Sequence, residues 1–504
     1  SLPGEAKPYY LSYVLTRYRQ WQIAGSLGGI FYSTVTPWQS SGGVQVMLGN
    51  YQHNSDIQYM GQVAPVQLPA ELDGYNIRRG FWETSDLMYR FSLQVMARKI
   101  AHLKSNPLPP AEAAVPDMQQ LPAVTKMVER PRPFEVDLAA LEGMVKELSV
   151  LFKDYKELFN SNVMLVAVEQ DNYRLTSENV RLKFPLGLVG LTVSASVRTT
   201  DGSTVSDVLA ISSLDNPADL PSIEELKKKV KDFADNLMEL KETPMIEEYY
   251  TGPVLFEGGA ASRLFTDNLL SPGRLLALRT MAPARGMLDE QLGRRIIDSR
   301  LTVKNYTTLA EYNGTPLFGC YEIDGDGVVP AAELTLVENG VFKRMLNGRV
   351  PTLKAPESTG SARFMISPDN PMAIVSPGTI HVQASKGVGP EKLKKALLKA
   401  AKEADLEYAY IVRRIGGEAS AVYKVNVKDG KETRVRVNNL SAPELTKLMD
   451  LKGISSDERV MNYFPNGVPA SLIYPSAIIV GDVEINRTTP KIEEEPVLKH
   501  PLQR

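Results

Sequence analysis

The segment from residue 252 to residue 265 has the clearest potential for chemistry. An apolar run at residues 253–256 leads into Gly258 and Gly259, and small residues then begin a predicted helix. Such a junction lets two backbone segments approach closely and leaves unpaired N–H groups at the start of the helix. The junction could therefore take part in main-chain contacts, but no pair of metal ligands follows on the helix.

Side chains that commonly ligate transition metals are few in this chain. The histidines are His53, His102, His381 and His500, and no two of them lie closer than 49 residues apart. Each is predicted to be a surface or structural histidine, because no local pair exists. The single cysteine, Cys320, excludes an internal disulfide framework and a metal cluster with several cysteines. No catalytic residue, metal ligand or cofactor is therefore predicted.

Other motifs favour turns over ligand sites. Residues 324–327 read Asp-Gly-Asp-Gly, but an EF-hand loop starting there would need glutamate at the position of Thr335. We predict a tight turn ahead of a strand instead. Residues 25–29 and 358–361 lack the Gly-x-Ser-x-Gly pattern of a serine hydrolase, and the first of them predicts a turn or bulge. Residues 385–390 lack the Gly-Lys-Ser/Thr ending of a phosphate-binding loop.

The composition limits the class of protein. The chain has 504 residues, too many for one hydrophobic core, so about two to four domains are expected. Its formal net charge is −2, from 57 basic and 59 acidic residues, and gives no sign of a nucleic-acid-binding surface. The sequence contains no run of about 18 apolar residues, so no membrane-spanning helix is predicted. Because the sequence begins at Ser1, both a removed signal peptide and an engineered start are consistent with it.

The elements around these motifs predict an α+β protein with several domains, built from mixed and antiparallel sheets with flanking helices. The first hundred residues combine strand-like runs with a helix that starts at Thr84 or Ser85. Seven prolines then predict an extended connector over the surface, followed by a helix–sheet–helix order. Short strands dominate the second half, including one at residues 316–323 and a hairpin turn at Asn339-Gly340. The predicted units are residues 1–104 (N-terminal α+β domain), 105–136 (proline-rich linker), 137–245 (central α+β module), 246–487 (β-rich C-terminal domain) and 488–504 (polar tail).

Several strings in the second half, taken in order, resemble a known family. They are residues 252–256 (Gly-Pro-Val-Leu-Phe), 324–330 (Asp-Gly-Asp-Gly-Val-Val-Pro), 336–341 (Leu-Val-Glu-Asn-Gly-Val), 358–360 (Ser-Thr-Gly) and 475–480 (Pro-Ser-Ala-Ile-Ile-Val). Their order and spacing resemble those of the TldD/PmbA family, bacterial and archaeal proteins once named modulators of DNA gyrase. The likeness covers most of residues 247–487. It implies an α+β fold and a role in metal-dependent proteolysis of small or unfolded polypeptides.

The resemblance also implies a pair of related subunits. One subunit carries a helical His-Glu-x-x-x-His motif that a later cysteine completes, and the other lacks these ligands and helps to enclose the substrate. In this chain Thr266 and Ser271 occupy the two histidine positions and Asp267 occupies the glutamate position. The later cysteine would fall within residues 463–471, which contain none. Hydroxyl groups are poor zinc ligands, so a zinc protease site is not expected here.

We therefore predict a non-catalytic subunit of a proteolytic system. Its predicted partners are a related zinc-bearing TldD-like subunit or a second copy of itself, together with a peptide or unfolded polypeptide substrate. The predicted substrate-binding residues are Gly258, Gly259, Thr266, Asp267 and Ser271. One alternative is a free-standing hydrolase with a rearranged site that uses Asp267, Glu257 or His381. Another is an exported peptide-binding module without a proteolytic role; the resemblance itself implies a cytoplasmic location.

Overall fold

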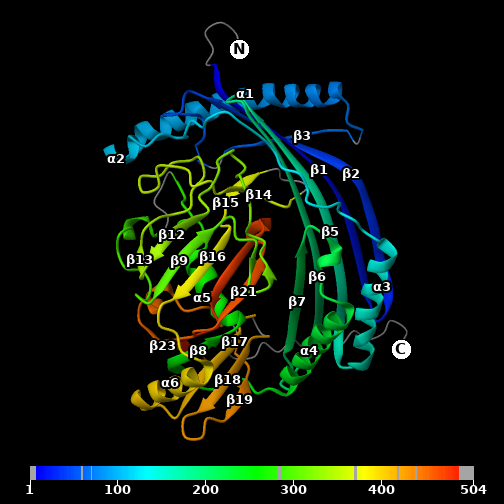
Figure 1. Cartoon of the computed structure of the whole chain (residues 1–504), viewed down its shortest axis with the longest axis vertical. Coiled ribbons are helices and arrows are strands. Elements are labelled where there is room, and N and C mark those ends of the chain that lie inside the picture. The colour runs from blue at the N-terminus through cyan, green and yellow to red at the C-terminus, as the bar shows by residue number, and fades with distance from the viewer. Residues whose placement is uncertain are drawn as a thin grey trace, which may run out of the picture.

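The chain folds into two β-rich halves that face each other (Figure 1). The computed structural model describes residues 7–486, except residues 58, 60, 70, 281–285, 368–371, 417–418 and 438–439. The predicted polar tail, residues 488–504, and Ser1 lie outside the described residues. No helix within the described ranges is long and apolar enough to cross a membrane.

A long, curved sheet of seven strands forms the first half. Six strands follow the order β3-β2-β1-β5-β6-β4, and β7 pairs with the rest of β6. The strands are β1 (Pro8–Ser26), β2 (Gly29–Leu48), β3 (Ala64–Val66), β4 (Val124–Met127), β5 (Leu158–Thr176), β6 (Val180–Arg198) and β7 (Thr204–Leu214). The pairing of β1 with β5 joins the predicted N-terminal domain and the predicted central module in one sheet.

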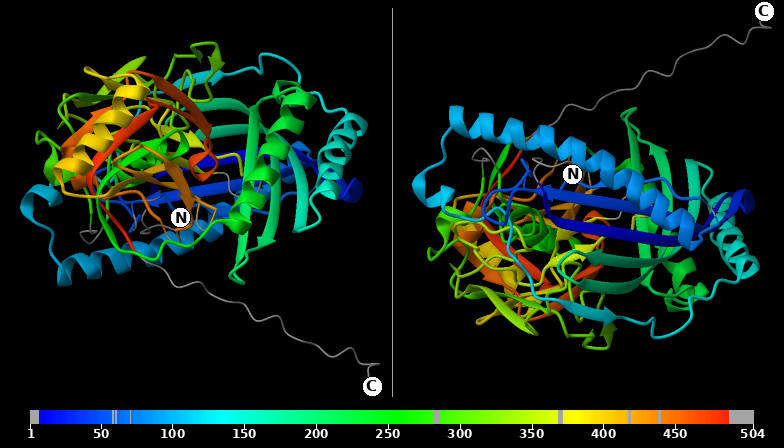
Figure 2. Two further views of the ribbon diagram at one scale, coloured as in Figure 1. Left: turned by 90° about the horizontal axis from the view of Figure 1, so that it is seen from below. Right: turned by 90° about the horizontal axis from the view of Figure 1, so that it is seen from above.

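The outer face of this sheet is covered by three helices, α1 (Gly74–Ser105), α3 (Leu138–Ser149) and α4 (Ile223–Glu242). Figure 2 shows α1 crossing over β1 and β2, where Val44 and Val46 pack against it. Alternate residues of a strand point to opposite faces. On β5, Leu165 therefore packs toward α3 and α4, whereas Gln170 and Arg174 point inward and contact the second half of the chain.

Two helical predictions in the first half need correction. Helix α1 begins at Gly74 and not at residue 84 or 85, because the Asp73 carboxylate accepts the backbone N–H groups of Tyr75 and Asn76 and so caps the helix. Among its first ten residues only Phe81 is buried, so the apolar periodicity that marks the rest of the helix is weak there. The proline-rich linker also contains a short helix, α2 (Pro110–Ala113), since proline fits the first turn of a helix.

The second half consists of two six-stranded sheets that share one core. The first has the order β13-β12-β9-β16-β22-β21 and the second has the order β19-β18-β17-β8-β23-β20. Their strands are β8 (Tyr250–Glu257), β9 (Leu301–Tyr306), β12 (Glu333–Glu338), β13 (Val341–Phe342), β16 (Thr379–Ala384), β17 (Tyr408–Arg414), β18 (Ala421–Asn426), β19 (Glu432–Val435), β20 (Leu451–Ile454), β21 (Glu458–Tyr463), β22 (Ala470–Pro475) and β23 (Ala477–Ile485). Two short ladders add β10 (Glu311–Tyr312) with β11 (Thr315–Pro316), and β14 (Ala362–Phe364) with β15 (Ala373–Val375).

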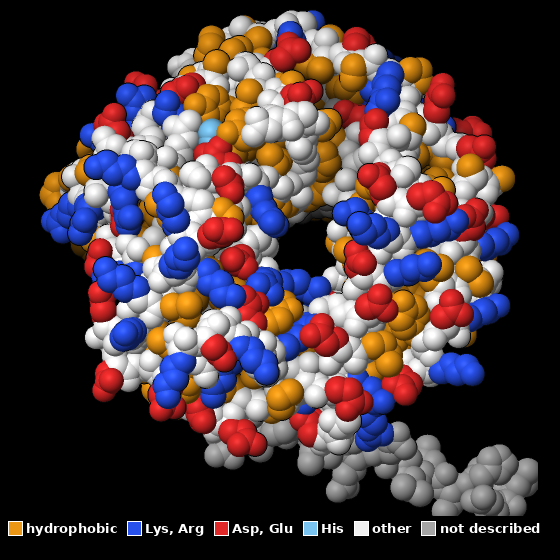
Figure 3. All heavy atoms as spheres, turned by 60° about the horizontal axis from the view of Figure 1, so that its bottom comes forward, with side chains coloured by type: hydrophobic (Ala, Val, Ile, Leu, Met, Phe, Trp, Pro, Cys, Tyr) orange, Lys and Arg blue, Asp and Glu red, His pale blue; other side chains and the backbone are white. Residues whose placement is uncertain are grey.

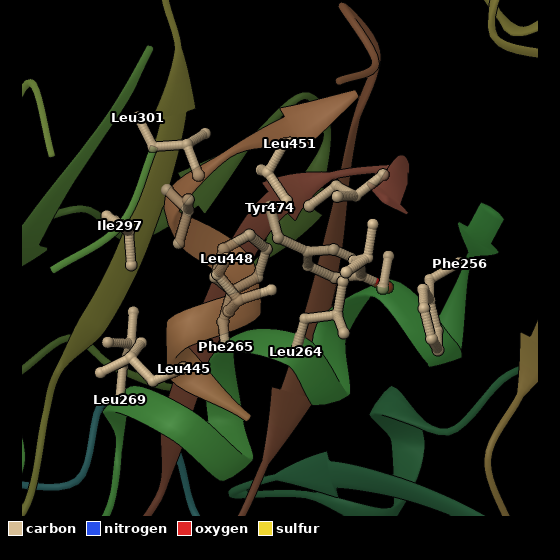
Figure 4. Packing of buried hydrophobic residues seen from close by; sticks show 14 of the residues in the cluster. Phe256, Leu264, Phe265, Leu269, Ile297, Leu301, Leu445, Leu448, Leu451 and Tyr474 are labelled. Atoms are coloured by element: carbon tan, nitrogen blue, oxygen red, sulfur yellow. The ribbon is translucent and has the colours of Figure 1, made fainter. Parts of the chain in front are cut away.

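Two helices complete this half. Helix α5 (Gly259–Leu269) contributes to the shared core, and Figure 4 shows Leu264, Phe265 and Leu269 of α5 pointing into it. Helix α6 (Pro390–Glu403) covers the other face of the second sheet, where Leu393 and Leu397 are fully buried. Burial on both sides therefore fixes β8, the strand that leads into α5.

Arginine side chains connect the two halves at two separate places. At the first place, Arg174 of β5 binds Asp326. At the second, Arg414 of β17 binds Asp207 of β7, and Arg436 binds the loop between β6 and β7. Figure 3 shows an opening that passes through the molecule, with basic and acidic side chains at its rim. The two halves thus meet at distant points and leave accessible space within the fold.

Candidate functional site

The predicted junction of strand, glycine and helix is present at the end of β8. Gly258 has φ 54° and ψ −127°, a conformation that side-chain-bearing residues rarely adopt, and its N–H donates to the Ser476 carbonyl at 2.8 Å. A Cβ atom at this position would also lie 3.0 Å from Nη1 of Arg459. Gly258 is buried and Gly259 is exposed, and no side chain caps α5.

The five predicted substrate-binding residues do not form one cluster. Thr266 and Asp267 lie on the outer side of α5, where the Asp267 carboxylate accepts a hydrogen bond from Nε of Arg263 at 2.8 Å. Ser271 lies beyond Leu269, the last residue of the helix. Since α5 has 11 residues, roughly 16 Å separates its glycine end from its serine end.

The side chains on α5 do not fit a zinc ion. Thr266 and Ser271 offer only hydroxyl groups, which bind zinc poorly beside imidazole or thiolate. Throughout the described ranges, no three His, Cys, Asp or Glu side chains lie close enough together to hold a metal ion. Cys320 is exposed, and partial burial of its sulfur raises the pKa of the thiol, which disfavours the thiolate that a metal would need.

The residues proposed for a rearranged hydrolase site each have a different partner. Glu257 accepts from Nε of Arg413 at 3.0 Å, and Asp267 pairs with Arg263. Nε2 of His381 lies 2.9 Å from Glu458, which also accepts the hydroxyl of Tyr312. No hydrogen bond or ion pair described for these residues joins Glu257, Asp267 and His381 to one another. These contacts therefore give no support to a rearranged hydrolase site that would combine the three residues.

A cavity of about 640 Å³ lies between the inner face of the large sheet and the second half of the chain. One wall comes from β1, β2 and β5, and the other comes from loops of the second half. Leu270 and Pro272, on either side of Ser271, line it. Pro465 and Asn466 also line it, and they fall within residues 463–471, where the resemblance places the missing cysteine. The cavity therefore lies next to Ser271 and residues 463–471, two places where the resemblance implies metal ligands in the zinc-bearing subunit.

Sequence reasoning missed this cavity, because its walls come from segments that are far apart in the chain. One local signal was available in the Asp-Gly-Asp-Gly motif. The predicted turn is confirmed by a hydrogen bond of 3.1 Å from the Gly327 N–H to the Asp324 carbonyl. The turn places Asp326 in the cavity wall, where Nη1 of Arg174 donates to it at 2.9 Å. The motif thus orients a carboxylate that joins the two halves.

Buried ion pairs form the polar part of the cavity wall. Arg279 lies 3.4 Å from Asp117, and Nζ of Lys99 lies 2.7 Å from the same carboxylate. Nη2 of Arg349 donates to Glu178 at 2.9 Å. All of these side chains are largely removed from water, so each charge depends on its partner.

Asp324 should make stability depend on pH near neutrality. Burial, and then repulsion from Asp326, raise the pKa of Asp324 from 3.8 to about 7 in the folded protein. A carboxyl with a raised folded pKa contributes stability that is fully present below its unfolded pKa of 3.8, and this contribution is lost progressively as the pH rises from there through the folded pKa of about 7. We expect the free energy of unfolding to fall by on the order of 1 kcal/mol between about pH 6 and pH 8. Denaturant unfolding at both pH values checks this, and Asp324→Asn, which cannot ionise, should remove that part of the slope.

The architecture defines a two-part α+β protein with a strand–glycine–helix junction beside an internal cavity. Residues 250–487 match the sequence profile of the PmbA/TldA metallopeptidase C-terminal domain. The second half of the chain thus carries a domain of the TldD/PmbA family, and the whole chain has the fold of the solved structures described next. The resemblance seen in the sequence and the predicted α+β class are both confirmed.

Three solved structures illustrate the shared fold. TldE from Thermococcus kodakarensis matches with a TM-score of 0.56 and 14% identity, over 95% of this chain and 96% of its own. A proposed modulator of a DNA gyrase from Thermotoga maritima gives the same values. A similar protein from Bacteroides thetaiotaomicron matches with a TM-score of 0.52 and 13% identity, over 94% of this chain and 95% of its own. A comparison with curated protein sequences gave no match. The family match over residues 250–487 supports a role related to proteolysis.

Proposed function

We propose that this protein is a non-catalytic subunit that binds and encloses peptide substrates for a zinc metallopeptidase partner. The observation that carries the proposal is the junction at Gly258 and the helix after it. The strand, the glycine turn and the helix are all retained, yet Thr266, Asp267 and Ser271 occupy the positions of the expected zinc ligands and base. A chain that keeps the shape of a site without its ligands is suited to holding a substrate rather than to activating water.

Two features support enclosure of a peptide. The cavity lies beside Ser271, the second of the substituted ligand positions, and the opening in Figure 3 gives access to the interior of the fold. The five predicted residues, Gly258, Gly259, Thr266, Asp267 and Ser271, are spread along the helix. They would therefore contact different parts of one extended chain and not one small ligand.

The expected partner is a related zinc-bearing TldD-like subunit, with a second copy of this chain as the lesser possibility. Catalysis would depend on the partner's zinc-bound water and glutamate.

The zinc content and peptidase activity of the isolated chain test this proposal. Purified alone, the chain should contain far less than one zinc per molecule and should not cleave fluorescently labelled casein, because no ligand set is available on α5. Co-expressed with a TldD-like subunit from the same organism, it should co-purify with that subunit and show cleavage that a chelator abolishes. Stoichiometric zinc and cleavage by the chain alone would contradict the proposal and support the rearranged hydrolase.

A further inference from the structure

Part of strand β2 forms an open edge of the large sheet (Figure 1). On one side β2 pairs with β1 along nearly its whole length, and on the other side β3 pairs only with Gly42, Gly43 and Val44. Within the described residues, no strand pairs with the outer edge of residues 29–41. Alternate residues of an edge strand direct their main-chain N–H and C=O groups away from the sheet, so this edge offers hydrogen bonds to a further strand.

The open edge of β2 has no charged residue. No Asp, Glu, Lys or Arg occurs between Arg19 and Asp56. Charged side chains on an edge strand normally discourage its pairing with another chain. The other described edge strands of more than three residues all carry such side chains, which are Lys126 in β4, Asp207 in β7, Glu432 and Arg434 in β19, Lys452 in β20, and Glu458 and Arg459 in β21. Strand β2 therefore lacks a protection that the other long edges of the described fold possess.

Apolar side chains accompany the free main-chain groups of β2. Phe31 is 65% exposed, Tyr32 is 45% exposed and Val35 is 44% exposed. Residues 31–35 are all exposed, so no helix or loop of the described chain covers them. Aromatic and β-branched residues fit a paired strand well. An uncharged, partly apolar and open edge is the kind that pairs with a strand of another chain.

The same edge of a second copy of the chain fits this surface. Two identical edges can pair antiparallel about a two-fold axis, because the same patch then contributes from both copies. No like charges would face each other, since the segment is uncharged. With the axis at Ser33, Phe31 of each copy lies opposite Val35 of the other, and Tyr32 lies opposite Thr34. Aromatic residues opposite β-branched residues are favourable cross-strand pairs.

We infer that two copies of this chain associate through residues 29–37 of β2 and continue the large sheet across a two-fold axis at Ser33. Pro37 sets the limit of the pairing, because proline cannot donate a hydrogen bond to the ladder. None of residues 29–37 lines the cavity, so the inference does not depend on the proposed function. The paired segment is short compared with the about 20–30 residues per side of a standard interface, so we expect a reversible dimer with a Kd on the order of 10 μM.

Sedimentation velocity of the full chain tests the inference. The chain should be mainly dimeric at about 100 μM and mainly monomeric at about 1 μM. Phe31→Lys combined with Val35→Lys places like charges opposite each other and should raise the Kd at least about tenfold. Phe31→Lys combined with Val35→Glu removes the same apolar groups but places opposite charges face to face, so it should dimerise at least about tenfold more tightly than the double lysine variant. Both positions are exposed, so both variants should fold.

Cross-linking tests the position of the axis. In a Cys320→Ser background, Ser33→Cys should form a covalent dimer on mild oxidation. Directly opposite residues of an antiparallel pair have Cα atoms about 4.5–5.5 Å apart, which is within the range of a disulfide. The substitution removes only an exposed hydrogen bond of 2.7 Å from Ser33 to Glu142. Leu87→Cys in the same background is the control, since Leu87 is exposed on α1 and should give little cross-linked product.

Four results would overturn the inference. They are a chain that stays monomeric at about 100 μM, a dimer of equal affinity in the two double variants, no more cross-linking of Ser33→Cys than of Leu87→Cys, and pairing of the β2 edge only with a co-expressed zinc-bearing subunit. None of them would alter the zinc content of the isolated chain or its cleavage of casein. Conversely, zinc on the isolated chain would overturn the proposed role without changing the dimer. The two proposals can therefore fail separately.

Discussion

Replacing Arg174 by methionine should lower the free energy of unfolding by about 3–5 kcal/mol, as is typical when one member of a buried ion pair is removed. The Arg174 side chain is 9% exposed and donates to Asp326 at 2.9 Å, to the Gly325 carbonyl at 2.6 Å and to Ser12 at 3.1 Å. The variant would leave the buried Asp326 without its ion-pair partner. It would also remove one of the ion pairs that connect the halves. Denaturant unfolding measures the loss.

A double variant tests whether the stability lost in Arg174→Met comes from the unpaired carboxylate of Asp326. Arg174→Met with Asp326→Asn should recover a substantial part of the stability, because the uncompensated charge is gone. Arg79→Met is the control, since Arg79 and Glu83 form an exposed pair on α1 that solvent screens, and its loss should lower the stability far less. Equal losses from Arg174→Met and Arg79→Met would show that the buried pair does not hold the halves together.

Local signals in the sequence predicted turns that depend on a few neighbouring residues. The hairpin at Asn339-Gly340 is confirmed, because both residues have positive φ and Glu338 pairs with Val341. The predicted turn or bulge at residues 25–29 is also confirmed, since Leu27 and Gly28 have positive φ and β1 and β2 pair on either side. In each case the physical cause is contained within a few residues.

Features that depend on distant parts of the chain were not predictable in this way. The β1–β5 pairing joins residues about 150 positions apart, and the intervening prolines suggested a domain boundary. The strand predicted at residues 316–323 is wrong, because only Thr315–Pro316 pairs, as β11, and the following residues form turns and loops. Apolar residues there are buried by tertiary contacts and not by a ladder, and the apolar pattern alone does not distinguish the two.

The candidate site also combines a feature that the local sequence predicts with features that depend on distant parts of the chain. The junction at Gly258 was predicted, because glycine is the residue that a sharp change of backbone direction demands. Arg349 was not singled out, since an arginine in a loop carries no motif. It acquires significance only when the fold buries it against Glu178. Burial of an ion pair between distant segments is a property of the folded chain.

Alanine substitutions at two adjacent glycines, Gly258 and Gly259, should change the free energy of unfolding in different directions. Gly258→Ala should lower the free energy of unfolding by about 1–3 kcal/mol, because φ 54° with ψ −127° is accessible almost only to glycine. Gly259→Ala should be neutral or stabilise by up to about 1 kcal/mol, since Gly259 is exposed at the first helical position and alanine favours a helix. A new Cβ there would meet only the Arg413 carbonyl, at 4.0 Å.

This comparison also separates the structural role of the junction from its proposed role in peptide binding. Because Gly259→Ala leaves the fold intact, any loss of peptide binding in that variant would come from the added methyl group at the exposed start of α5. A loss would support main-chain contact between the peptide and this junction, whereas unchanged binding would show that the peptide does not contact the start of α5. If both alanine variants were equally destabilised, the strained conformation would not be specific to Gly258, and the close turn between β8 and α5 would need another cause.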